Sequence, residues 1–216
     1  MSRLKFSASM SLDRYSAGPD QSRDNPLGVG GRGLHEWAFA TRTFHAMQGQ
    51  EGGETGVDDE QAGAWSHGTG ATIMGRNMFG PVRGEWGDES WNGWWGDDPP
   101  YHTPVFVLTH HAREPVEMQG GTTFHFVTDG IEAALERARE AAGGLDVSIG
   151  GGAATVQQYL RVGLVDEMRI HVVPVLLGGG ERLFDDVGGA IDDYELVELV
   201  SSPAAAHFTY RRRGKG

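Results

Sequence analysis

Three consecutive glycines stand between an expected strand and an expected helix in the stretch Val-Ser-Ile-Gly-Gly-Gly-Ala-Ala-Thr-Val, residues 147–156. The β-branched residues before the glycines favour a strand, and a helix is expected from residue 153. Glycines let a pyrophosphate approach the main chain, and a helix N-terminus supplies free N–H groups and the positive end of a dipole. The same pattern is typical of a tight strand-to-helix turn without a ligand, so both interpretations stay open.

The rest of the chain alternates strand and helix patterns around this turn. The glycine spacing is not G-x-G-x-x-G, and the run lies late in the chain, which disfavours a Rossmann dehydrogenase. Strands are expected at residues 5–11, 71–74, 105–109, 124–127, 146–149, 167–176, 194–200 and 206–212. Helices are expected at residues 34–47, 58–67, 129–142 and 153–162, the third of them capped by Asp129.

This alternation predicts an α/β fold of three layers, α/β/α, with a mostly parallel central sheet. The helix-free end of the chain predicts an antiparallel edge at the C-terminus. A surface loop is expected at residues 48–56, and no proline-rich linker divides the chain, so one domain is expected over residues 1–216. Ligands of such sheets bind beyond the carboxyl ends of the strands.

The composition disfavours several classes of partner and site. A net charge of -12 repels phosphate backbones, so nucleic acid is not an expected partner. The absence of Cys removes thiolate zinc sites and fits a cytoplasmic location. The N-terminus has no signal-peptide pattern, and the longest apolar stretch, residues 172–177, is too short to span a bilayer, so no membrane partner is expected. The nine His residues show no metal-binding spacing, so no metal site is expected.

Cationic side chains follow two of the expected strands. Arg76 comes just after residues 71–74, where a guanidinium can pair with a phosphate in fork geometry. Thr109, His110 and Arg113 lie in the same way at the end of the strand expected at residues 105–109. A single Arg more often forms an ordinary ion pair at the surface than binds a phosphate. Two such loops together fit a dinucleotide with an extra 2′-phosphate, and no acid is placed to hold a free ribose hydroxyl, which favours NADPH over NADH.

Five motifs in order resemble the dihydrofolate reductase superfamily. The chain is most similar to stand-alone relatives of the reductase domain of the bifunctional riboflavin-biosynthesis deaminase–reductase, from Leu4 to about Arg212. The motifs are Ser-Leu-Asp-Arg-Tyr-Ser-Ala-Gly (11–18), Met-Gly-Arg-Asn-Met-Phe (74–79), Thr-Asp-Gly-Ile-Glu-Ala-Ala-Leu (128–135), Ile-Gly-Gly-Gly (149–152) and Pro-Val-Leu-Leu-Gly-Gly-Gly (174–180).

The resemblance implies a dihydrofolate reductase-like fold, a homodimer and an NADPH site of twelve residues. Ser9 and Ser16 are implied at the nicotinamide carboxamide. The residues implied at the phosphates and the adenine end are Gly75, Arg76, Asn77, Thr109, His110, Gly150, Gly151, Gly152, Ala153 and Thr155.

The sequence departs from the family pattern around the nicotinamide and at the proton donor. Arg14 and Ser16 replace the usual Gly and Ile. Leu34 stands where dihydrofolate reductase has the helix carboxylate that supports protonation of the pterin, so dihydrofolate is not the expected substrate. Glu36 and Asp13 are the nearby acids, and they are the candidate catalytic residues.

The expected function is hydride transfer from NADPH to a small, heterocyclic substrate. The first alternative is a 5-amino-6-(5-phosphoribosylamino)uracil reductase, whose substrate phosphate needs a basic cluster such as Arg32, Arg42 and Arg182. The second is a non-catalytic nucleotide-binding or scaffold protein. The Trp-rich residues 86–104 are either a wall for a flat heterocycle or a surface insertion, and the insertion is slightly favoured.

Overall fold

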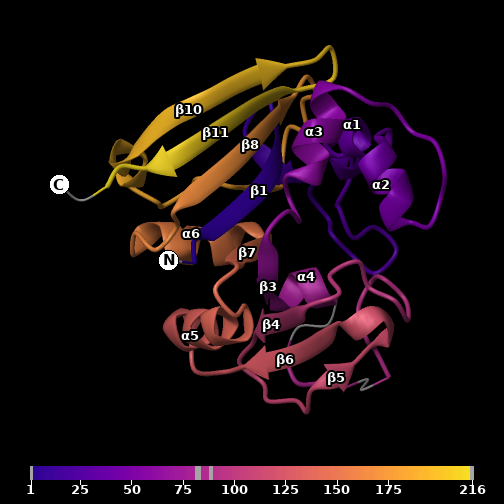
Figure 1. The fold of residues 1–216 in the computed structure, drawn as a ribbon, viewed down its shortest axis with the longest axis vertical. Coiled ribbons are helices and arrows are strands. Elements are labelled where there is room, and N and C mark those ends of the chain that lie inside the picture. The colour runs from indigo at the N-terminus through magenta and orange to yellow at the C-terminus, as the bar shows by residue number, and fades with distance from the viewer. Residues whose placement is uncertain (1, 81–83, 88–89, 215–216) are drawn as a thin grey trace.

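The computed structural model describes residues 2–80, 84–87 and 90–214, and a large mixed sheet runs through them (Figure 1). Within the described residues, nine strands form this sheet in the order β10-β11-β8-β1-β7-β3-β4-β6-β5. The strands are β1 (Leu4–Ser11), β3 (Thr69–Gly75), β4 (Pro104–Leu108), β5 (Val116–Glu117), β6 (Thr123–Val127), β7 (Asp146–Gly151), β8 (Glu167–Val173), β10 (Tyr194–Ser201) and β11 (Ala206–Arg212). A separate antiparallel pair consists of β2 (Tyr15–Ala17) and β9 (Glu181–Arg182).

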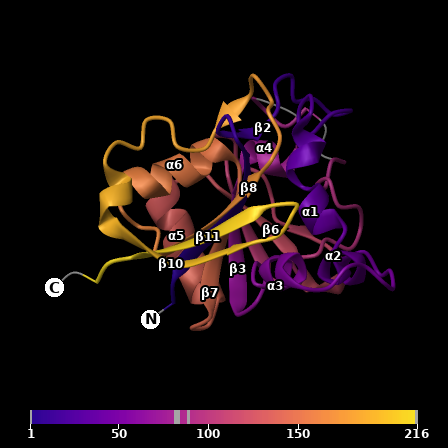
Figure 2. The same cartoon turned by 90° about the horizontal axis from the view of Figure 1, so that it is seen from above.

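The predicted parallel sheet with an antiparallel C-terminal edge is confirmed. The six strands from β8 to β6 are parallel to one another. The hairpin of β11 and β10 adds an antiparallel edge beside β8, and β5 pairs antiparallel with β6 at the opposite edge. Helices α5 (Ile131–Ala141) and α6 (Ala153–Arg161) lie on one face of the sheet, while α1 (Glu36–Phe39), α2 (Arg42–Met47) and α3 (Val57–Gly63) lie on the other (Figure 2). A short helix, α4 (Arg76–Phe79), follows β3 directly. None of the helices described is long and apolar enough to cross a membrane.

The two faces of the sheet differ in polarity. The main core fills the space between the sheet and helices α5 and α6, and it includes Phe6, Ile149, Tyr159 and Met168. Side chains alternate between the faces along a strand, so the residues between those of the core point toward α1 and α3. On that face β8 presents Glu167, Arg169 and His171, which makes it unusually polar.

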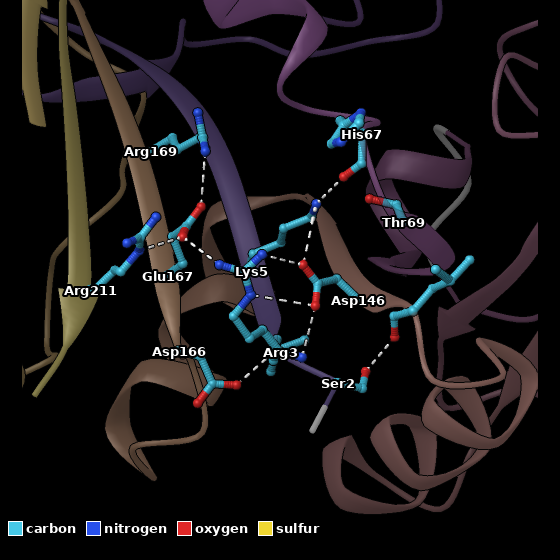
Figure 3. A network of polar contacts seen from close by, with 12 residues as sticks. Ser2, Arg3, Lys5, His67, Thr69, Asp146, Asp166, Glu167, Arg169 and Arg211 are labelled. Carbon is cyan, nitrogen blue, oxygen red and sulfur yellow. Dashed lines mark hydrogen bonds and ion pairs between the residues drawn. The ribbon is translucent and has the colours of Figure 1, made fainter. Parts of the chain in front are cut away.

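A buried carboxylate organises the charges at the amino end of β1 and β8 (Figure 3). Glu167 is 1% exposed and lies within 2.9 Å of Arg3 and of Arg211, with Arg169 at 3.1 Å. Arg3 also pairs with Asp146 at 2.7 Å. Several arginine donors therefore share two carboxylates, which offsets the cost of removing Glu167 from water.

Three predicted elements differ from the structure. The helix expected at residues 34–47 is broken, because Thr41 is extended and its side chain accepts a hydrogen bond from the Phe44 N–H, which starts α2 anew. Asp129 does not cap α5: Gly130 holds the cap position, and the carboxylate pairs with Arg137 at 2.6 Å. The strand expected to reach residue 176 ends at Val173, since the following proline has no N–H to donate.

Candidate functional site

Two adjoining cavities open at the carboxyl ends of the parallel strands. The outer cleft has a volume of about 330 Å³, and it lies between the ends of β3, β4 and β6 and the start of α6. The inner pocket has a volume of about 370 Å³ and lies between β1, the end of β7 and the Trp-rich segment. Both cavities are lined by Asn77, Gly152, Ala153 and Glu181, so they lie directly next to each other.

The triple glycine lies where the two cavities meet: Gly152 lines both of them, and Gly150 and Gly151 line the inner pocket. Strand β7 ends at Gly151, which has a φ of 125° that favours glycine, and Gly152 is the residue before α6. The peptide bond between these two glycines is cis. No described side chain caps the N-terminus of α6. The Thr155 N–H donates to the Gly152 carbonyl, so the N–H groups of Ala153 and Ala154 are the ones that could receive an anion. The strand-to-helix turn therefore has the geometry of a phosphate-binding loop.

Arg76 lies at the wall of the outer cleft with part of its guanidinium unpaired. Its Nη1 donates to Thr109 Oγ1 at 3.2 Å, and the group lies over the Trp86 ring at 3.1 Å from the centroid. The Nε and Nη2 atoms are buried without a hydrogen-bond partner among the described residues. Burial, together with the charge of Arg113, lowers the pKa of Arg76 to about 10, so it remains a cation at neutral pH. A buried cation with unused donors suits an anionic ligand.

The structure brings all twelve residues predicted for the cofactor to these two cavities. Those in the outer cleft are Gly75, Arg76, Asn77, Thr109, His110, Gly152, Ala153 and Thr155. Those in the inner pocket are Ser9, Ser16, Asn77, Gly150, Gly151, Gly152 and Ala153. Their individual roles toward a cofactor stay predictions, but the shared location is the one that the resemblance requires.

The two predicted catalytic acids lie outside the lining of both cavities. The Asp13 carboxylate accepts hydrogen bonds from the Leu177 and Gly178 N–H groups, at 3.1 and 2.7 Å, and so holds two loops together. A hydrogen bond from the Ser11 side chain and these backbone bonds lower the Asp13 pKa to about 2, which keeps it ionised. The Glu36 side chain is 68% exposed and lies 3.9 Å from Arg32. The structure therefore gives neither acid the position of a proton donor.

Aromatic and uncharged groups dominate the inner pocket. Trp94 and Trp95 form part of its wall, so the expectation that this segment is a surface insertion is wrong for these two residues. His35 and the loop residue Leu27 also line it, and sequence reasoning missed Leu27. His35 and Glu181 are the titratable groups in the described lining, which contains no Lys or Arg. Burial lowers the pKa of His35 to about 4, so His35 is neutral near pH 7.

The described residues contain no cluster of three or more His, Asp or Glu that could hold a metal ion.

Comparisons with known proteins agree with this geometry. A Shewanella sp. PV-4 protein assigned to riboflavin biosynthesis has a similar structure, with 24% sequence identity, a TM-score of 0.63 and 99% of each chain covered. Enterococcus faecalis dihydrofolate reductase complexed with NADP(H) is 11% identical, with a TM-score of 0.51, and the match covers 98% of this chain and 96% of that chain. A third similar structure is the diaminohydroxyphosphoribosylaminopyrimidine deaminase/5-amino-6-(5-phosphoribosylamino)uracil reductase of Thermotoga maritima. It is 11% identical, with a TM-score of 0.56, and the match covers 98% of this chain and 57% of that chain. These likenesses establish the dihydrofolate reductase-like fold.

Sequence comparison gives the family. Bacillus subtilis YyaP, an uncharacterized protein, is 28% identical over 122 residues, which span 55% of this chain and 64% of that protein. The model of the RibD C-terminal domain matches residues 3–203. Because this match covers nearly the whole sheet and both cavities, the chain belongs to the RibD C-terminal domain family.

Proposed function

We propose that the protein is an NADPH-dependent reductase that transfers a hydride to a small, planar and uncharged heterocycle. The observation that carries the proposal is that the two cavities lie next to each other, with a cation in the outer cleft, a glycine loop where they meet and an aromatic wall in the inner pocket. A nicotinamide dinucleotide needs both environments side by side: a region that binds its phosphates and a flat, aromatic region for its nicotinamide ring. Membership of a family of reductase domains supports the same reaction class.

The residues present fit the cofactor. The unpaired donors of Arg76 suit the 2′-phosphate, with Thr109 and His110 beside it in the outer cleft. The glycine loop and the start of α6 suit the pyrophosphate. Ser9 and Ser16 line the inner pocket, where the nicotinamide ring would lie. When bound, the nicotinamide supplies the hydride, and the protein's part is to orient both partners and exclude water.

The lining of the inner pocket favours an uncharged substrate over a phosphorylated one. Each of the three arginines considered for a substrate phosphate has another partner: Arg32 approaches Glu36, Arg42 pairs with Asp59 at 3.3 Å, and Arg182 donates to the Tyr15 hydroxyl at 3.0 Å. The uracil reductase of riboflavin biosynthesis is therefore the less supported alternative. A non-catalytic nucleotide-binding or scaffold protein is the third.

Cofactor titration tests the proposal. The melting temperature of the purified protein should rise with NADPH more than with NADH at equal concentration, since binding to the native state stabilises it by mass action. A panel of uncharged pterins, aminopyrimidines and quinoid acceptors should then include one that is reduced with oxidation of NADPH. If neither NADPH nor NADH changes the melting temperature, the protein would be a scaffold and not a reductase.

The remaining expectations are a homodimer and a cytoplasmic location. The edge strand β10 exposes Leu196, Val197 and Leu199, which supports an association of two copies along this edge. Light scattering on the purified protein measures the oligomeric state, and a monomer at micromolar concentration would contradict the homodimer.

A further inference from the structure

A row of three hydrogen bonds crosses the polar face of the sheet, beneath α1. Ser7 Oγ lies 2.8 Å from His171 Nε2, the Nδ1 atoms of His171 and His207 are 2.7 Å apart, and His207 Nε2 lies 2.8 Å from Asp58 Oδ1. The two imidazoles come from directly paired positions of β8 and β11, and Asp58 comes from the first turn of α3. Four polar groups far apart in sequence thus form one continuous row.

The row joins the inner pocket to the outer surface of the helical layer. Ser7 lines the inner pocket, whereas the Asp58 side chain at the other end is 18% exposed. Between them, His171 and His207 are each 1% exposed. The Trp37 ring covers both imidazoles, with centroids 4.5 and 4.9 Å away, and its Nε1 donates to Ser9 Oγ. A proton that moves along this row is therefore shielded from water over its middle section.

The contact between the two Nδ1 atoms couples the protonation of the rings. A hydrogen bond between two ring nitrogens needs a proton on one and a lone pair on the other. If His207 carries protons on both nitrogens, His171 must accept at Nδ1 and hold its own proton at Nε2, facing Ser7. If His207 is neutral and donates to Asp58, His171 must hold its proton at Nδ1. The tautomer of His171 therefore follows the charge of His207.

We propose that Asp58, His207, His171 and Ser7 form a proton relay that delivers to the inner pocket the proton required with each hydride. This inference rests on the proposed reductase function, and it replaces the two acids that the structure places elsewhere. Ser7 is the group that would touch the substrate, and the other three are positioning and proton-carrying residues behind it.

The transfer balances as follows. In the loaded state His207 is an imidazolium paired with the Asp58 carboxylate, His171 is neutral with its proton on Nε2, and the Ser7 hydroxyl points into the pocket. The Ser7 proton passes to the substrate, the His171 Nε2 proton passes to Ser7 Oγ, and the His207 Nδ1 proton passes to His171 Nδ1. One proton has left the row, and His207 is neutral with its proton on Nε2. Before the row can transfer again, the ring proton of His171 must return to Nε2, that of His207 must move to Nδ1, and the Ser7 hydroxyl must turn back to the pocket. A solvent proton taken up by Asp58 then passes to His207 Nε2 and completes the loaded state. Substrate, hydride from NADPH and this proton together give the reduced product.

The charges around the row decide where the extra proton resides. Burial, and then the nearby His207, Arg169 and His35, lower the pKa of His171 to about 3, so His171 stays neutral. His207 is faced by Asp58 from α3, by His171 from β8 and by the uncharged Trp37 from α1. The single carboxylate of the row thus lies next to the imidazole that must carry the charge.

Long-range proton–nitrogen NMR spectra of the isotope-labelled protein, recorded from pH 5 to 8.5, test the relay. His171→Gln and His207→Gln variants assign the signals. As His207 loses its second proton, His171 should change from the Nε2–H to the Nδ1–H tautomer with the same midpoint. Asp58→Asn should lower that midpoint, because a neutral amide no longer stabilises the charged imidazole, whereas Glu60→Gln, an exposed acid in the same turn of α3, should leave it unchanged.

A His171 ring that keeps one tautomer over the whole range, or a His207 ring that is never protonated in it, would overturn the relay. The melting temperature with and without NADPH is measured on the same samples. Stabilisation by NADPH together with a fixed His171 tautomer would contradict the relay and leave the reductase proposal intact. Tautomer exchange without stabilisation by either cofactor would contradict the reductase, and with it the role of the row in reduction.

Discussion

Gly75 and Thr155 lie so close that a Cβ atom at position 75 would overlap the Thr155 hydroxyl. The contact sets how near the end of β3 comes to the first turn of α6, and both residues line the outer cleft. Gly75→Ala should therefore force the two elements apart and lower the free energy of unfolding by about 1–3 kcal/mol, as overpacking does elsewhere. Urea denaturation of the variant and the parent measures this loss.

Changes at position 155 separate the overlap from other effects of the added methyl group. Gly75→Ala combined with Thr155→Ala should recover most of the lost stability, because the overlapping hydroxyl is gone. Gly75→Ala combined with Thr155→Ser keeps the hydroxyl and should recover little. Equal recovery in the two double variants would show that the hydroxyl contact does not set the spacing.

Arg76 should discriminate between the two nicotinamide cofactors. A hydrogen bond to a charged group contributes about 1.5–3 kcal/mol, so Arg76→Ala should weaken NADPH roughly 10- to 100-fold. NADH lacks the 2′-phosphate and should be affected much less. Fluorescence titration with both cofactors measures the two dissociation constants, and Arg161→Ala, at the far end of α6, is the matched control. Equal losses for NADPH and NADH would assign Arg76 another role.

The glycine loop and the central strands could be predicted from the sequence because their signals are local. Val147 and Ile149 before the glycines and Val105, Phe106 and Val107 of β4 are β-branched or aromatic, which favours strands. The order of strands and helices then predicts a mostly parallel sheet. The clustering of the twelve cofactor residues followed from the resemblance together with this topology. Carboxyl ends of parallel strands meet at one edge, so residues placed just after strands come together there.

Other features depend on partners far along the chain. The role of Asp13 is set by the N–H groups of Leu177 and Gly178, which lie more than 160 residues away. The row from Ser7 to Asp58 requires the pairing of β8 with β11 and the docking of α3 on the sheet. The hydrophobic periodicity of the sequence does not predict contacts between residues so far apart. A pattern search based on metal-binding spacing passes over His171 and His207, since they are 36 residues apart.

Glu167 should be a major source of stability at the amino end of the sheet. Its carboxylate is buried between three arginines, and Glu167→Gln leaves Arg169 and Arg211 without their carboxylate partner, while Arg3 keeps Asp146. Breaking a fully buried ion pair costs about 3–5 kcal/mol. Because Arg3 and Arg211 are about half exposed and water can solvate them, a smaller loss of about 1.5–3 kcal/mol is expected in urea denaturation. Glu198→Gln, on the exposed strand β10, is the control and should change stability little. A small effect of Glu167→Gln would mean that the arginines are stabilised by water instead.

Protonation of Glu167 should lower the stability of the fold in acid. Burial raises the pKa of Glu167, but the hydrogen bond from Arg211 and the charges of Arg169 and Arg3 outweigh burial and bring it below the ordinary value of 4.5. A carboxyl whose pKa is lower in the folded state stabilises the fold above its unfolded pKa. The free energy of unfolding should fall as the pH drops below about 4.5 and through the folded pKa, and less steeply in Glu167→Gln. Parallel pH profiles for the two proteins would contradict this assignment.

The proton relay also has a kinetic consequence. With a quinonoid dihydropterin, which takes up one hydride and one proton, His171→Gln should slow NADPH oxidation roughly 100-fold, the usual range for loss of a general acid. The NADPH-induced rise in melting temperature should persist, because His171 lies outside the lining of both cavities. The parent should show a solvent deuterium isotope effect under single turnover. His125→Gln removes a half-buried imidazole from β6, at the other side of the sheet, and should leave the rate and the isotope effect unchanged. A rate in His171→Gln within twofold of the parent would show that water, and not this row, supplies the proton.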